Sequence, residues 1–148
     1  MSNPFDIRTV LLAKHAQHVA LVHFPIALFL VGFAFDLAAH RTKRGDLATV
    51  ARHNLTLAAI CTIPVFATGL AAWQWALEGA RLKGVLLLHL VFASLASVLI
   101  WIAGWLHVRA ARKPDSPLPA FRLPIEAVAA VLIVITGHLG GFVSGVSS

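Results

Sequence analysis

Three histidines lie at similar depths in three long apolar segments, where their imidazoles could bind a metal ion or a haem iron. His23 lies about four residues inside the first segment, His89 about five residues inside the third, and His138 near the end of the fourth. At about 1.5 Å per residue, His23 and His89 lie roughly 6–8 Å below one membrane surface. A single histidine at this depth is equally typical of a helix end. Three on separate segments favour a site that faces the protein interior.

Small and aromatic residues near these histidines would suit a flat cofactor. Glycines would make room for a porphyrin, and a tryptophan could pack against its edge, while neutral imidazoles ligate haem iron, copper and zinc. No thiol, methionine or carboxylate lies in this layer to complete a copper or zinc site, so haem is favoured. The predicted cofactor-binding residues are His23, His89, His138, Trp73, Gly69, Gly140 and Gly141. The three histidines are also the expected ligands if the cofactor is a metal ion. His15 and His18 precede the first segment, and we expect them to lie at the surface.

The composition indicates which elements must position these residues. The 148-residue chain is 59% hydrophobic and 12% charged, with a mean hydropathy of +0.84, whereas soluble domains are about a quarter charged. Four apolar runs, each close to the roughly 20 residues that a helix needs to cross a bilayer, lie at about 19–39, 54–77, 84–107 and 124–143. We therefore expect one transmembrane domain over 1–148, an all-α four-helix bundle with up-down topology. No internal repeat is evident. In such a bundle the first and third helices are diagonal, which makes His23 and His89 the expected axial pair.

The positive charges predict an orientation rather than a nucleic-acid partner, although the formal net charge is +6. The end with both termini and the 78–83 loop carries Arg8, Lys14, Arg81 and Lys83. The opposite end carries Arg41, Lys43, Arg44, Arg52, Arg109, Arg112, Lys113 and Arg122. Because cytoplasmic loops are enriched in Lys and Arg, we expect the second set in the cytoplasm. Both termini are then extracytoplasmic, which in a bacterium means a multi-pass protein of the inner membrane with periplasmic termini.

A second polar set gathers at the expected cytoplasmic end. It comprises Asp36, His40, His53, His107 and Glu126. His107 lies about five helical turns from His89 on the same helix face, which would allow a second cofactor layer. The alternative is a set of interfacial groups beside a basic loop, with Asp36 paired to an arginine such as Arg41 or Arg122. We favour the alternative.

The stretch "HVALVHFPIALFLVGFAFDLA" (18–38) resembles the opening signature of a family of bacterial predicted membrane proteins with the domain of unknown function 2231. That signature runs His-Pro-x-x-Val-His-Phe-Pro-Ile-Ala, with Asp-Leu near the end of the span. Here Val19 stands where the family usually has proline. The resemblance continues with Gly69 and Trp73, with His89, and with "GHLGG" (137–141), after which "FVSGVSS" replaces the usual Leu-Val-Tyr and a further His-Gly. Some members look to be joined to c-type cytochrome domains, which implies periplasmic electron transfer.

These features together predict a small b-type cytochrome-like membrane subunit that binds haem b in the outer half of the bundle. The candidate partners are a periplasmic c-type cytochrome or a quinone, and further copies or other subunits in an oligomer. We expect an electron-transfer or accessory subunit rather than a stand-alone enzyme. A copper or zinc site on the same histidines is one alternative. A structural or assembly subunit without a cofactor is the other.

Overall fold

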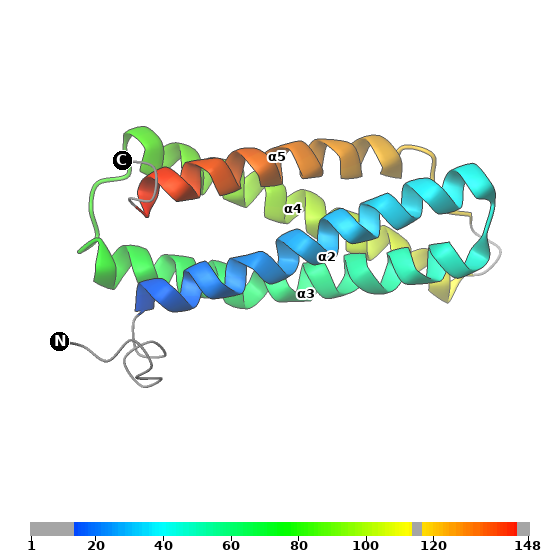
Figure 1. Cartoon of the computed structure of the whole chain (residues 1–148), viewed down its shortest axis with the longest axis horizontal. Helices are drawn as coiled ribbons and strands as arrows, with labels where there is room; N and C mark the ends of the chain where they lie inside the picture. The colour runs from blue at the N-terminus through cyan, green and yellow to red at the C-terminus, as the bar shows by residue number, and fades with distance from the viewer. Residues whose placement is uncertain (1–13, 114–116, 145–148) are drawn as a thin grey trace.

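Four long helices make up the part of the chain that the computed structural model describes, residues 14–113 and 117–144 (Figure 1). They are α2 (Lys14–Thr42), α3 (Gly45–Ala76), α4 (Gly84–Arg112) and α5 (Arg122–Val143). All four are long and apolar enough to cross a membrane. Helices that follow one another in sequence pack against one another. The predicted all-helical, up-down four-helix membrane bundle is therefore confirmed.

Short connections join the helices at both ends of the bundle. Between α2 and α3, Lys43 takes a left-handed conformation, with φ of 59°, and reverses the chain within two residues. Asp46 lies in the first turn of α3, where the helix dipole favours a negative charge. Between α3 and α4, Gly79 and Gly84 have φ of 60° and 57°, which glycine adopts without strain. These turns keep consecutive helices antiparallel.

The bundle is built from two helical hairpins. Contacts are most numerous within the pairs α2–α3 and α4–α5 and fewer between the two pairs. Figure 1 shows both described chain ends and the 77–83 connection at one end, with α2 and α4 running obliquely toward the other end. We call the first of these the termini end, and the opposite end, which carries the larger set of Lys and Arg, the basic end.

The apolar core lies midway between these two ends. Leu55 on α3 fits between two glycines, because a Cβ atom at Gly32 would lie 2.8 Å from its Cγ and one at Gly104 would lie 3.2 Å from its carbonyl oxygen. Small residues of this kind let membrane helices approach closely. The core cluster comprises Phe29, Leu55, Ala58, Ala96, Ile100, Ala103, Ala129 and Ile133.

The outward faces of the helices are apolar. Large hydrophobic side chains such as Leu57, Leu95 and Val131 are about half exposed. In the most apolar window of each helix, only 11% to 22% of the residues are buried inside the bundle. A surface of this composition is stable against lipid rather than water. The chain is therefore a multi-pass membrane protein in contact with the bilayer.

Candidate functional site

Two adjoining cavities lie toward the termini end, between the two hairpins. The main cavity has a volume of about 320 Å³ and is lined from all four helices, by His18, His23 and His89 among others. The side cavity has a volume of about 280 Å³, and its lining includes His18, His89 and Trp73. The two linings are mostly apolar, and they share His18, Val65, His89, Ala93, Ser97 and Val143. The cavities therefore form one apolar region with imidazoles in its walls.

Each of the three lining histidines points its Nδ1 atom at a backbone carbonyl oxygen. The acceptors are Val65 for His18 (3.1 Å), Val19 for His23 (2.7 Å) and Thr136 for His89 (3.1 Å). A carbonyl oxygen only accepts hydrogen bonds, so the proton must be on Nδ1. In a neutral imidazole the lone pair is then on Nε2. This is the tautomer that a histidine adopts when it binds a metal through Nε2 and is oriented by a hydrogen bond from its other nitrogen.

Two of these imidazoles lie against glycines on the neighbouring helix. A Cβ atom at Gly69 of α3 would lie 3.0 Å from Cε1 of His18, and one at Gly140 of α5 would lie 3.2 Å from Cε1 of His89. Both distances are tighter than ordinary van der Waals contact. The two glycines thus make room for the imidazole rings themselves.

The structure brings together all of the predicted site residues except His138. The main cavity is lined by His23, His89, Gly140 and Gly141, and the side cavity by Gly69, Trp73 and His89. The indole Nε1 of Trp73 donates to the carbonyl oxygen of Ala80, 2.9 Å away, and so ties the 77–83 connection to the cavity wall. His138 is exposed, lines neither cavity, and has its ring edge-on to Phe142. The cofactor-binding role of this set stays a prediction.

His18 is the lining residue that the sequence argument missed. It was expected at the surface because it lies about 140° around the helix from His23, and two such side chains do not share one face. In the structure His18 is half-buried and His23 is exposed, yet both border the main cavity. A cavity this wide spans more than one face of α2. The side chain of His15 lies outside the described residues.

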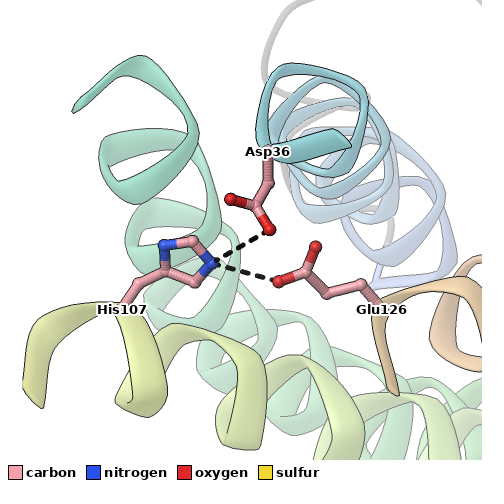
Figure 2. Close-up of side chains that lie close together, drawn as sticks. All are labelled: Asp36, His107 and Glu126. Carbon is pink, nitrogen blue, oxygen red and sulfur yellow. Dashed lines mark hydrogen bonds and ion pairs between the residues drawn. The ribbon is translucent and has the colours of Figure 1, made fainter. Parts of the chain in front are cut away.

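A second cluster of titratable side chains lies near the basic end (Figure 2). Asp36 of α2, His107 of α4 and Glu126 of α5 point toward one another, and each is at most 2% exposed. The Nε2 atom of His107 lies 3.0 Å from Oε1 of Glu126 and 3.9 Å from Oδ2 of Asp36. The three side chains form a buried polar group inside an otherwise apolar bundle.

Arg122 completes this group and confirms one of the two partners suggested for Asp36. Its Nε and Nη2 atoms donate to Oδ2 and Oδ1 of Asp36, at 2.7 and 3.3 Å. Within the described residues, Oε2 of Glu126 is buried and has no hydrogen-bond partner. By contrast, His40 and His53 are exposed. These two histidines are therefore exposed, as interfacial groups would be, while His107 is buried.

The buried group could hold a metal ion. Asp36, His107 and Glu126 each offer one ligand atom, and these atoms all lie within 4.8 Å of one another. Two carboxylates face one guanidinium, so one further positive charge, on a metal ion or on the imidazole, would make the group neutral. The unpartnered Glu126 oxygen is an acceptor that such an ion would satisfy. The pairing of Glu126 with His107 depends on how α4 and α5 are rotated against each other, which no local pattern in the sequence indicates.

Comparison with protein families matches residues 14–146 to the family described as "Predicted membrane protein (DUF2231)". The match covers most of the chain and both sites. No curated protein and no solved structure matches the chain. The resemblance noted from the first apolar segment and from "GHLGG" is therefore confirmed, and the function has to be argued from the sites.

Proposed function

The chain belongs to the DUF2231 family of predicted membrane proteins, and we propose that it is a b-type cytochrome-like subunit that binds haem near the termini end of the bundle. The observation that carries this proposal is the main cavity, where imidazoles from two different hairpins border one apolar space. Their Nδ1 atoms are engaged by backbone carbonyls, which suits ligation through Nε2. Within a membrane, ionisable side chains in such a position tend to mark function.

The residues present fit a haem in three respects. The cavities are apolar, as the porphyrin face requires, and their volumes are near the range of about 300–1,000 Å³ typical of ligand sites. His89 and His23 are the predicted ligands, and His138 is the predicted alternative. Gly141 lines the main cavity without a side chain, while the space beside Gly140 is occupied by the ring of His89. When bound, the haem iron would supply a one-electron redox centre.

The proposed role is electron transfer on the extracytoplasmic side of the bacterial inner membrane. Both ends of the described chain and the cavities lie toward the same end of the bundle, and the basic end carries more Lys and Arg. By the positive-inside rule, this arrangement supports periplasmic termini. A periplasmic c-type cytochrome or a membrane quinone could then exchange electrons with the haem. Reporter fusions at the C-terminus that are active only in the cytoplasm should be inactive, and activity there would reverse the proposed orientation.

The direct test is the absorption spectrum of the protein purified after haem-replete expression. A Soret band and a pyridine haemochrome spectrum of haem b are expected, with about one haem per chain. The double variant His23→Ala/His89→Ala should lose the haem, whereas Trp75→Phe, a change at an exposed aromatic, should keep it. The absence of a Soret band from the wild-type protein would overturn the proposal.

The same purified protein distinguishes the two alternative functions of this site. Copper or zinc in stoichiometric amounts, with no haem spectrum and with loss in the histidine variants, would favour a non-haem metal site. No bound group, together with a lower unfolding temperature in the histidine variants, would favour a structural or assembly subunit.

A second candidate function, binding of a metal ion at the basic end, is supported by the unpartnered Oε2 atom of Glu126 beside His107 and Asp36. Metal analysis should then find an ion that Glu126→Gln loses and Glu78→Gln, a change at an exposed loop residue, keeps. Equal metal content in the two variants would exclude this site.

A further inference from the structure

The two hairpins repeat one side-chain contact at the same spacing. In the first hairpin, His18 of α2 donates to the carbonyl of Val65 of α3, 47 residues later and at 3.1 Å. In the second, His89 of α4 makes the same contact with the carbonyl of Thr136 of α5, again 47 residues later and at 3.1 Å. The sequence shows no evident repeat, so this equivalence emerges only from the contacts.

The repeat extends to the neighbours of both histidines. Gly69 lies one turn after Val65 and receives the imidazole of His18, and Gly140 lies one turn after Thr136 and receives the imidazole of His89. Towards the basic end, Asp36 follows His18 by as many residues as His107 follows His89. These two side chains also meet, with Oδ2 and Nε2 3.9 Å apart. Equivalent positions of α2 and α4 thus meet near the basic end, and near the termini end they border the same cavities.

Repeated contacts of this kind are what an approximate two-fold axis along the bundle would produce. The operation exchanges α2 with α4 and α3 with α5, which are parallel pairs in an up-down bundle (Figure 1). His18 and His89 are then equivalent residues of the two hairpins, and both border both cavities. His23 has no such counterpart, because the equivalent position on α4 is Ser94. Its Nδ1 atom bonds within its own helix, to Val19.

We infer that His18 and His89 are the two ligands that would hold a flat cofactor between the hairpins. The inference rests on the proposed function and names His18, rather than His23, as the partner of His89. Haem iron accepts two imidazole ligands, and His18 and His89 are two imidazoles at equivalent positions that border the same cavities. A tetrahedral copper or zinc site needs a third and usually a fourth ligand, and the symmetry supplies neither. His23 then borders the site without ligating the iron.

The ligand pair is tested by haemin titration of the cofactor-free protein in detergent, read by optical and electron paramagnetic resonance spectra. The wild-type protein should give a six-coordinate, low-spin spectrum. His18→Ala and His89→Ala should each lose it, and His18→Gly should regain it when free imidazole is added. The matched control, His40→Ala, changes an exposed histidine near the other end of the same helix and should keep the low-spin spectrum. The variant His23→Ala tests the alternative ligand pair.

The outcomes separate the inference from the proposed function. If the wild-type protein binds haem but His23→Ala rather than His18→Ala abolishes the low-spin signal, the proposed function stands and the ligand pair is wrong. If the wild-type protein binds no haem, both are wrong. In the cofactor-free protein, nitrogen-15 spectra should show both His18 and His89 as the Nδ1–H tautomer, and a different tautomer in either ring would refute the repeated contact itself.

Discussion

The ion pair between Asp36 and Arg122 should be strongly coupled, and a double-mutant cycle measures that coupling. Arg122→Gln removes a guanidinium that donates to both oxygens of Asp36. The imidazole of His107, whose Nε2 lies 3.9 Å from Oδ2 of Asp36, would supply a second positive charge only if protonated. Breaking a buried pair by removing one partner typically costs roughly 3–5 kcal/mol. We expect a loss in this range for Arg122→Gln.

The other two variants of the cycle should lose less free energy of unfolding than Arg122→Gln. Asp36→Asn leaves Arg122 close to Glu126, one turn along α5, so the positive charge keeps a carboxylate nearby. In the double variant Asp36→Asn/Arg122→Gln, neither residue carries a charge, and two amides of similar size replace the pair. The double variant should therefore be more stable than Arg122→Gln alone. The coupling free energy should be about 2–3 kcal/mol.

The assay is reversible unfolding in mixed micelles of a mild detergent and dodecyl sulfate, followed by circular dichroism. The matched control is the same cycle on Arg44 and Asp46, an ion pair whose side chains are each 61% exposed. Exposed pairs of this kind contribute little, so their coupling should be too small to measure. A coupling at Asp36 and Arg122 no larger than in the control would refute the view that burial makes this pair important.

Three further predictions concern stability. Gly32→Ala should lower the free energy of unfolding by about 1–3 kcal/mol, because its Cβ would lie 2.8 Å from Cγ of Leu55. Its control is Gly137→Ala, where the new Cβ would meet no atom within 4 Å, so the free energy of chemical unfolding should stay the same or rise by up to about 1 kcal/mol. Trp101→Phe removes an indole N–H that donates to two oxygens of α3, at 2.6 and 3.0 Å, and should cost about 1 kcal/mol in the same assay. Glu126→Gln keeps a hydrogen-bonding group beside its imidazole partner and removes one of two buried carboxylates, so its unfolding temperature should stay within a few degrees of wild type; a large drop, equal to that of Glu126→Ala, would contradict this.

The sequence predicts the bundle well because hydrophobicity is a property of whole segments rather than of single residues. Each apolar run is long enough to cross a bilayer, and the loops between them are short or rich in proline and charge, so helix number and topology follow. The partner of Asp36 could also be narrowed to two arginines, because a buried carboxylate needs a cation and few lie at its depth. The family followed from one specific motif around His23.

The rotation of each helix could not be predicted in the same way. His138 was predicted to join the site from its depth along the helix, but its side chain is exposed, and depth alone says nothing about the direction in which a residue points. His18 was assigned to the surface by counting degrees around an ideal helix, without knowing how wide the cavity is. The contact between His107 and Glu126 joins two helices whose relative rotation is set by packing along their whole length.

The apolar core around Leu55 has a consequence for what can pass along the bundle. It lies between the histidine-lined cavities and the Asp36–His107–Glu126 group, and its members are aliphatic or aromatic and at most 5% exposed. The side chains of this layer carry no polar atom that could relay a proton or hold an ion. These core residues therefore offer no polar path between the two ends, whereas an electron needs none.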